Sequence, residues 1–226
     1  MGILDISGDA QRAFSALQKG GIAIFPVDVG YTIAGGSQES LLRIFNTKGR
    51  QATKLNAMVG DMEIHRSLHL LGQRERDMVS TLTEDYDLPL GVIAPYDKRH
   101  PMIGRLDPAS LAGSSREDTI AMLVNAGPFH AEICRLSREE GFPIFGSSAN
   151  LTNTGTKFRV QDIPLQLLEI ADVVVDYGLR KYYHYQRSAT LINFETMDVI
   201  RVGSCYDLIS DVMRRHFGIE LPQTTA

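Results

Sequence analysis

The stretch GGIAIFPVDVGYTIAGG, residues 20–36, decides how the fold begins. Its apolar run has the length and the β-branched content of a buried strand. The run ends in a polar turn that carries Asp28 and Tyr31, and the cations Lys48 and Arg50 follow after one predicted helix. Ligands of open α/β sheets usually bind where strands end. The stretch therefore predicts a pocket wall beside a cationic site.

Length and composition predict one globular domain that spans residues 1–226. We expect its core at about 7–208 and a C-terminal helix with a short tail at 206–226. Hydrophobic residues make up 43% and charged residues 22% of the chain, which is typical of a globular rather than a disordered protein.

Charge, hydropathy and cysteine count exclude several classes of protein. The formal net charge is −4, which argues against a basic surface field for nucleic acid but is compatible with a basic patch inside a cleft. The sequence contains no run of about 18 apolar residues, so it predicts no membrane span. Cys134 and Cys205 are far apart in the sequence, which favours a reducing compartment over a disulfide scaffold or a zinc site. We therefore expect a cytoplasmic protein.

Hydrophobic periodicity predicts alternating helices and strands. The helices are expected at 7–21, 37–48, 61–86, 128–141, 163–171 and 206–218, and the strands at 22–26, 55–60, 88–96, 119–127, 142–146, 172–178, 188–194 and 198–203. Because the alternation is irregular, the pattern favours a mixed sheet with helices on both faces.

Capping and loop signals refine this pattern. Ser7 or Asp9 is expected to cap the first helix, Ser37 the second, and Gly72 is expected to break the third. The polar segment 97–117 is expected to be a long irregular loop that serves as a lid or a mobile insert.

Lys48 and Arg50 are the first candidates for chemistry, since they bracket a glycine at the end of a predicted helix. A guanidinium offers a planar fork to phosphate and an ammonium offers a point charge. The alternative is that both cations only stabilise the negative end of the helix dipole.

The loop FGSSANLTNTG, residues 145–155, is the second candidate. Ser148 and Asn150 offer short polar side chains directly after a strand, and the loop amides can form an anion-binding nest. An ordinary polar turn is the alternative interpretation.

Other residues give weaker signals. Arg201 ends a predicted hairpin arm and is a weak candidate ligand on its own. His65 and His69 lie four apart on a predicted helix, but they lack the acidic residue of the zinc-protease pattern and are expected to be solvated. No nucleophile elbow, Walker loop or dinucleotide-binding glycine motif is present, so a nucleotide would have to bind by another device.

Five ordered stretches together resemble the YrdC-like family of threonylcarbamoyl-adenylate synthases. They are IFPVDVGYTIAG at 24–35, IFNTKGRQATKL at 44–55, TIAMLVNAGPFHAEI at 119–133, PIFGSSANLTNTG at 143–155 and SATLINFETMDVIRVG at 188–203. They are similar to the family's P-T-D-T-x-Y-G-L, K-x-R, V-x-V-R-x-P, S-x-N and S-T-V-V-D…L-R-x-G segments. The resemblance covers most of the chain.

The resemblance implies an α/β fold, a YrdC-like twisted mixed sheet with helices on both faces and an open central cavity. It implies a nucleotidyltransferase that converts ATP, bicarbonate and L-threonine to threonylcarbamoyl-AMP and pyrophosphate for tRNA modification. By matching positions, Lys48 and Arg50 are the catalytic candidates, and the nucleotide ligands are those two residues with Ser148, Asn150 and Arg201. Mg²⁺ would accompany ATP without a dedicated protein motif.

The departures from the family pattern cluster in the substrate pocket, which the resemblance assigns to Val27, Val29, Tyr31 and Leu123. The two valines replace the threonines of the turn, and Leu123 stands where the family has an arginine. A site built to bind a hydroxyl discriminates strongly against its absence. The loss of two hydroxyls and a guanidinium therefore favours a less polar acceptor than threonine.

Three hypotheses for function follow. The first is threonylcarbamoyl-adenylate synthesis, and the second is related carbamoyl-adenylate chemistry on a different amine or acid. The third is a non-catalytic module that binds a nucleotide or RNA. For RNA contact, RKYYHYQR at 180–187 is the best local candidate, since it interleaves cations with aromatic rings. A solvated loop is the plainer interpretation of that segment.

Overall fold

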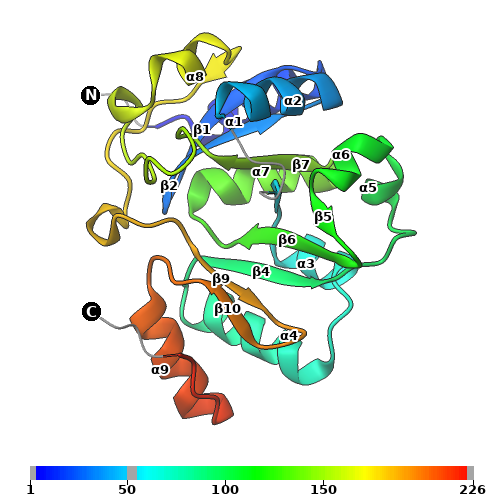
Figure 1. Ribbon diagram of the computed structural model, residues 1–226, viewed down its shortest axis with the longest axis vertical. Coiled ribbons are helices and arrows are strands. Elements are labelled where there is room, and N and C mark those ends of the chain that lie inside the picture. The colour runs from blue at the N-terminus through cyan, green and yellow to red at the C-terminus, as the bar shows by residue number, and fades with distance from the viewer. Residues whose placement is uncertain (1–3, 50–54, 223–226) are drawn as a thin grey trace.

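One mixed sheet organises the protein, which we describe from a computed structural model covering residues 4–49 and 55–222 (Figure 1). Nine of its ten strands follow the order β10-β9-β4-β6-β3-β7-β2-β1-β8, and β5 pairs with β6. The strands are β1 Ile22–Val27, β2 Gly30–Gly35, β3 Ala57–Val59, β4 Leu90–Pro95, β5 Ser115–Arg116, β6 Thr119–Val124, β7 Ile144–Ser148, β8 Val173–Val174, β9 Thr190–Asn193 and β10 Asp198–Arg201. The predicted mixed sheet is confirmed.

The helices connect these strands and cover the sheet. They are α1 Ile6–Gln18, α2 Gln38–Thr47, α3 Met62–Leu68, α4 Gln73–Ser80, α5 Pro101–Gly104, α6 Pro108–Ala112, α7 Pro128–Glu139, α8 Leu165–Glu169 and α9 Tyr206–Phe217. A π-helical turn at Thr81–Asp85 continues α4, and short 3₁₀ turns lie at Val160–Asp162 and Tyr183–Tyr185. None of the helices within the described residues is both long and apolar enough to cross a membrane.

The opening stretch forms a β-hairpin rather than a strand and a turn. β1 and β2 pair antiparallel from Ile22 opposite Gly35 to Val27 opposite Gly30. The sequence analysis missed β2 because its glycine ends resemble a turn. Gly30 has a φ of +132°, a conformation that side-chain-bearing residues rarely adopt, so it allows the tight connection.

Helices pack on both faces of this hairpin, as predicted. Side chains that alternate along β1 point to opposite faces. Phe25 and Val27 belong to the apolar cluster that includes buried residues of α1 and α7. Ile22 and Ile24 belong to a second cluster with Ile44 of α2. The hairpin is buried throughout.

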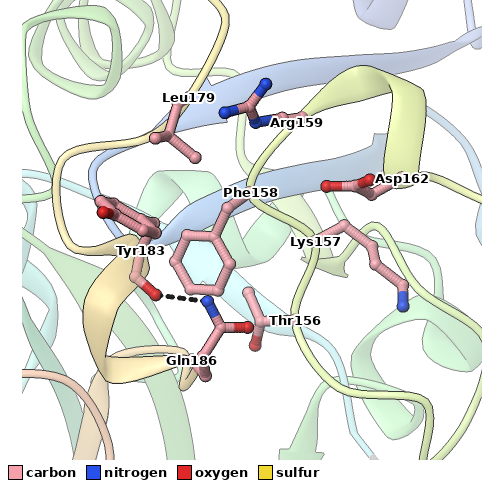
Figure 2. Close-up of a pocket in the computed structure, with 8 residues that line it drawn as sticks. All are labelled: Thr156, Lys157, Phe158, Arg159, Asp162, Leu179, Tyr183 and Gln186. Carbon is pink, nitrogen blue, oxygen red and sulfur yellow. Dashed lines mark hydrogen bonds between the residues drawn. The ribbon is translucent and has the colours of Figure 1, made fainter.

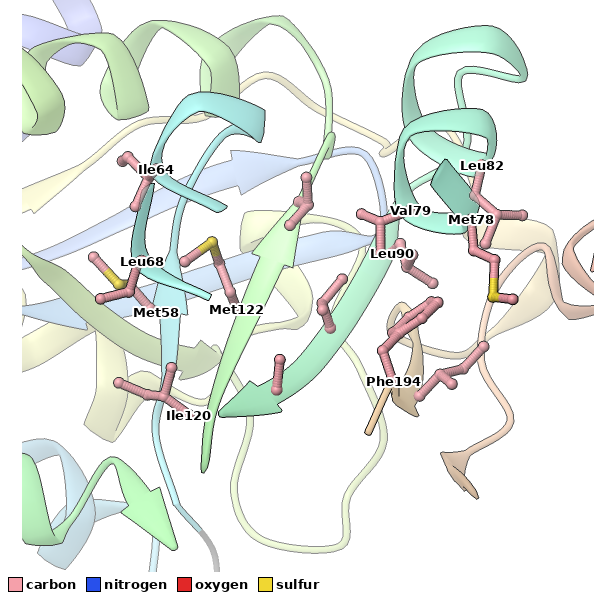
Figure 3. Close-up of a cluster of buried hydrophobic side chains, with 14 of the residues drawn as sticks. Met58, Ile64, Leu68, Met78, Val79, Leu82, Leu90, Ile120, Met122 and Phe194 are labelled. Atoms are coloured by element: carbon pink, nitrogen blue, oxygen red, sulfur yellow. The ribbon is translucent and has the colours of Figure 1, made fainter. Parts of the chain in front are cut away.

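The largest apolar cluster lies at the other half of the sheet (Figure 3). Met122 of β6 and Leu90 of β4 point into it, together with side chains from α3, α4 and α9. Figure 1 shows α4 and α9 at this end and α1, α2 and α8 at the other.

The sheet curls strongly between β1 and β6. The amide of Asp28, just after β1, donates to the carbonyl oxygen of Ala126, just after β6, at 2.8 Å. Three strands separate β1 and β6 in the sheet, so a flat sheet would hold their ends about 19 Å apart. The curl brings the β1–β2 turn against the start of α7.

Several local predictions were wrong. Segment 97–117 is not an irregular loop, because it contains α5, α6 and β5. Met102 and Ile103 of this segment are buried in the largest cluster, which argues against a lid. The cap of α1 is Asp5, whose carboxylate accepts from the Gly8 amide at 2.9 Å, rather than Ser7 or Asp9.

The second helix and the break at Gly72 were predicted better. Ser37 caps α2 as expected, and Gly72 precedes α4. Leu41 and Ile44 of α2 are buried, whereas Leu42 is exposed.

The expectation of solvated histidines was also wrong. His65 and His69 are buried, and their Nδ1 atoms lie 2.9 Å apart, so one ring donates to the other. Burial lowers the pKa of His65 to about 4 and that of His69 to about 3. Among the described residues, Nε2 of His69 has no hydrogen-bond partner.

We predict that Gly36→Ala destabilises the fold strongly. A Cβ at this position would lie 1.7 Å from the main-chain oxygen of Leu17 in α1. Relieving this overlap should cost roughly 3 kcal/mol or more of unfolding free energy, measured by urea denaturation. Gly104→Ala is the matched control, since a Cβ there meets nothing within 4 Å. Equal stabilities of the two variants would contradict the packing described here.

We predict that acid destabilises the protein through its buried histidines. Their folded-state pKa values lie below the unfolded value of about 6.5, so the unfolded state binds more protons. Stability is full above about pH 6.5 and falls as the pH drops towards 4. His65→Gln should flatten this dependence by up to about 1.4 kcal/mol per pH unit, measured by urea unfolding from pH 7 to 4.5. The exposed His184 provides the control variant His184→Gln. If both variants keep the unmodified slope, the explanation fails.

Candidate functional site

The candidate site lies at the end of the sheet where the parallel strands β1 and β7 finish. β1 and β7 both pair antiparallel with β2, so they run parallel to each other. Their carboxyl ends carry the turn at Asp28 and the loop that begins at Ser148. The carboxyl ends of strands are the usual place for ligands in α/β sheets.

Lys48 joins this loop to the end of α2. It is the C-cap residue of that helix and is buried, with 5% of its surface exposed. Its ammonium donates to the main-chain oxygen of Ser148, and its own carbonyl oxygen accepts from the Thr152 amide at 3.1 Å. A buried ammonium needs such polar partners because desolvation otherwise costs several kcal/mol. The structure thus brings Lys48 and the loop together across 100 positions of sequence.

Ser148 and Asn150 form the second half of this arrangement. The Ser148 hydroxyl donates to Oδ1 of Asn150, and Nδ2 of Asn150 donates to the Leu151 carbonyl oxygen at 2.6 Å. The Ala149 amide between them donates to the carbonyl oxygen of Tyr31 at 2.8 Å. We call Lys48, Ser148 and Asn150 the hook. Its side chains are held in place before any ligand arrives.

Two hydroxyls beside the hook remain unsatisfied. Within the described part of the chain, Oγ of Ser147 and Oγ1 of Thr152 are buried without a hydrogen-bond partner. Buried polar atoms are nearly always paired, so each exception calls for an explanation. Both atoms are enclosed by protein, and successive residues of a strand face opposite sides of the sheet, so the Ser147 hydroxyl does not extend the hook.

The predicted nest of loop amides is smaller than expected. Four amides of the loop already donate to protein carbonyl oxygens, namely those of Ala149, Asn150, Thr152 and Thr154. Side chains, rather than these amides, are therefore the groups that the loop can offer to an anion.

A cluster of charges surrounds Asp28 at the same edge. Its carboxylate lies 3.5 Å from the Arg180 guanidinium and 3.6 Å from the Lys181 ammonium. The same ammonium lies 3.9 Å from the carboxylate of Asp87. Burial raises the pKa of Asp28 in spite of the two cations.

The cations come from segment 176–187, here called the strap, which crosses from the end of β8 to the start of β9 (Figure 1). The Tyr182 amide donates to the Asp28 carbonyl oxygen at 3.0 Å. Nε of Arg180 donates to the Val27 carbonyl oxygen at 3.0 Å. The strap is therefore fixed to the β1–β2 turn by main-chain contacts as well as by charge.

Tyr31 holds the other end of the strap. Its hydroxyl donates to the Gly178 carbonyl oxygen at 2.9 Å and accepts from the Tyr177 amide at 3.1 Å. Burial raises the pKa of Tyr31 to about 12, so the phenol is neutral at physiological pH. The phenol therefore orders the strap, and the role of Tyr31 in a substrate pocket stays a prediction.

The remaining pocket candidates lie in or against the core. Val27 and Val29 are 3% and 2% exposed and pack in the cluster beneath α1 and α7. Leu123 is half-buried against the same cluster. All three side chains face apolar neighbours, and their assignment to a substrate pocket stays a prediction.

The predicted arginines are placed differently. Arg50 lies outside the described residues. Arg201 ends β10, with four strands between it and β7, and its guanidinium donates to the Ala189 carbonyl oxygen at 2.9 and 3.1 Å. No contact in the described residues joins it to the hook. Arg201 is exposed, and desolvation by the surrounding protein lowers its pKa.

Sequence reasoning missed Arg180, Lys181 and Asp87 as neighbours of Asp28. The two cations were noted only as part of a stacking segment. Spacing could not reveal the cluster, because Asp28, Asp87 and the strap are far apart in the sequence.

A metal ion has no dedicated site within the described ranges, where no group of three or more His, Cys, Asp or Glu could hold one. The absence of such a group is compatible with Mg²⁺ that arrives with ATP, because phosphates and waters supply most of the ligands of that ion.

Comparisons with known proteins identify a family and a shared fold. The sequence profile of the Sua5_yciO_yrdC family, described as Telomere recombination, matches residues 15–203. No curated protein sequence matches the chain.

Solved structures share the fold at low sequence identity. The hypothetical protein smu.1377c from Streptococcus mutans UA159 is 20% identical, with a TM-score of 0.75 and 93% of each chain covered. P. abyssi Sua5, complexed with L-threonine, is 17% identical with a TM-score of 0.70, and the match covers 94% of this chain and 58% of that one. E. coli YciO is 18% identical with a TM-score of 0.65 and coverages of 86% and 88%.

Proposed function

This chain belongs to the Sua5/YciO/YrdC family, whose profile spans residues 15–203, and from that premise we propose that it is a nucleotide-dependent synthase. It joins ATP, bicarbonate and an amino acid into a carbamoyl-adenylate and releases pyrophosphate. L-threonine is the first acceptor to test, because P. abyssi Sua5 has been solved with L-threonine bound. The product would feed tRNA modification in the cytoplasm.

The contact of Lys48 with the Ser148 loop is the observation that carries this proposal. Lys48, at the end of α2, meets Ser148 and Asn150, at the end of β7. Cations and short donors held in place in advance are what phosphoryl chemistry requires, because they stabilise charge without reorganising.

The chemistry assigns a step to each part of the site. The amine of the acceptor adds to bicarbonate and loses water, which gives a carbamate. A carbamate oxygen then attacks the α-phosphorus of ATP, and the bond to pyrophosphate breaks. Lys48 stabilises the charge that develops on the phosphate oxygens, while Ser148 and Asn150 orient the nucleotide. Arg50 and Arg201 are proposed to add further positive charge.

We predict that Lys48→Met and Asn150→Ala each lower ATP-dependent pyrophosphate release by about 10²–10³-fold. The assay contains ATP, Mg²⁺, bicarbonate and L-threonine. Lys19→Met removes an exposed lysine of the same length and is the matched control. Urea unfolding of each variant separates a lost ligand contact from a lost fold. Full activity in a folded Lys48→Met protein would rule out the assigned role.

A second candidate function changes only the acceptor. It is favoured by Val27, Val29 and Leu123, which stand where the family pattern has two threonines and an arginine, because a site without hydroxyls or a guanidinium gives threonine little to bind. The family membership and the hook are the same in both candidates. A non-catalytic module that binds nucleotide or RNA is the remaining alternative.

We predict that Val29→Thr and Leu123→Arg, made singly, raise threonine-dependent turnover by roughly 10-fold or more over the parent. The parent and both variants are compared across a panel of amino acids of graded polarity. Ala121→Ser places a hydroxyl on the same face of β6 as Leu123 and serves as a control. If neither variant gains turnover with threonine, divergence of these positions does not explain the choice of acceptor.

A further inference from the structure

A hollow of about 450 Å³ lies between the strap and the loop that follows Gly155 (Figure 2). Its size is within the range of small-molecule sites. Phe158 and Arg159 stand on the loop side, and Tyr183 and Gln186 stand on the strap side. No residue of the hook lines it, so the hollow is a separate feature of the surface.

The two walls are fixed to the core and to each other. The Arg180 amide of the strap donates to the Phe158 carbonyl oxygen of the loop at 3.0 Å. The Tyr31 amide of β2 donates to the Lys157 carbonyl oxygen at 2.9 Å. Main-chain bonds of this kind hold the hollow open as a preformed shape rather than as a gap between mobile loops.

One wall presents apolar surface to solvent. Tyr183 is 46% exposed and Leu179 is 41% exposed, and Figure 2 shows the two side by side across from the loop. An exposed aromatic ring at the mouth of a hollow is a surface on which a nucleobase can stack.

The other wall presents two opposite charges that do not pair. In the described residues, neither the Arg159 guanidinium nor the Asp162 carboxylate makes a hydrogen bond or an ion pair, although both line the hollow. Lys157 lies beside them, and its ammonium donates to the Thr154 carbonyl oxygen at 2.9 Å. The wall can therefore donate to an anion through Arg159 and accept from a hydroxyl or an amine through Asp162.

We propose that this hollow binds one nucleotide unit, with its base on Tyr183 and its phosphate at Arg159. A simple anion would leave the aromatic wall and the carboxylate unused, and an apolar ligand would leave the charges unused. A nucleotide matches all three features, because it carries a flat aromatic base, donor groups on base and ribose, and an anionic phosphate. Asp162 accepts from those donors.

The nucleotide unit has two sources of the same chemistry, a free mononucleotide and one residue of single-stranded RNA. The inference does not depend on the proposed synthase activity, since the hollow shares no residue with the hook. Binding at the hollow and turnover at the hook are therefore measured separately.

The test is isothermal titration of the full chain with AMP and, in a second arm, with a five-residue oligoadenylate, at low and at moderate salt. Tyr183→Ala and Arg159→Gln should each weaken binding by roughly 5- to 100-fold. The matched controls are Tyr86→Ala, at a tyrosine that is 45% exposed elsewhere, and Arg99→Gln, at an exposed arginine. Both control variants should bind as the parent does. Urea unfolding confirms that each variant is folded.

The outcomes distinguish a free nucleotide from RNA as the ligand, and they support or overturn the proposal. Saturable binding of AMP alone assigns a free nucleotide, and tighter, salt-sensitive binding of the oligonucleotide assigns RNA. Either result supports the hollow when Tyr183→Ala and Arg159→Gln reduce it. Absence of binding by both probes overturns the proposal. Binding that only Lys48→Met reduces also overturns it, because the probe then occupies the hook.

Discussion

Burial of the β1–β2 hairpin on both faces is the constraint on which the rest of the structure depends. Every residue of the two strands is buried, with α1 and α7 on one face and α2 and α8 on the other. A hairpin packed in this way cannot shift register without moving its apolar side chains into the wrong layer. Its turn is thereby held at a fixed place, and the groups that meet at the turn take their positions from it.

Two segments meet the hairpin at its turn, namely the connection from β6 to α7 and the strap. The Asp28 amide bonds to Ala126 and its carbonyl oxygen to Tyr182, so main-chain hydrogen bonds join the turn to β6 and to the strap. Gly127 is required here, because a Cβ at this residue would lie 2.3 Å from a carboxylate oxygen of Asp28. The close approach leaves Asp28 partly desolvated, and Arg180 and Lys181 offset that cost. The turn thus holds the strap in position through hydrogen bonds, and the strap supplies the cations that balance the Asp28 carboxylate.

The same geometry places two candidate binding features on the hairpin without merging them. The hook is tied to β2 through the Ala149 amide and the Tyr31 carbonyl oxygen, and the hollow is tied to it through the Tyr31 amide and the Lys157 carbonyl oxygen. Tyr31 therefore supports both through its main chain while its phenol holds the strap. Any change that tilts this residue should alter both features at once.

Local sequence determined most of the helices and strands of this protein, because apolar periodicity, the cap at Ser37 and the break at Gly72 act over a few residues. The resemblance of its five motifs also identified the family correctly. The short elements β2, α5 and α6 were not predicted, because the glycine and proline residues in them are typical of turns and loops. The meeting of Lys48 with Ser148 was expected from the family pattern and not from spacing. Only the tertiary structure decided the burial of His65 and His69, the ion pairs of Asp28 and the hollow beside Tyr183. Each of these arises where segments distant in the sequence pack together, and the few residues of a local pattern do not specify such packing.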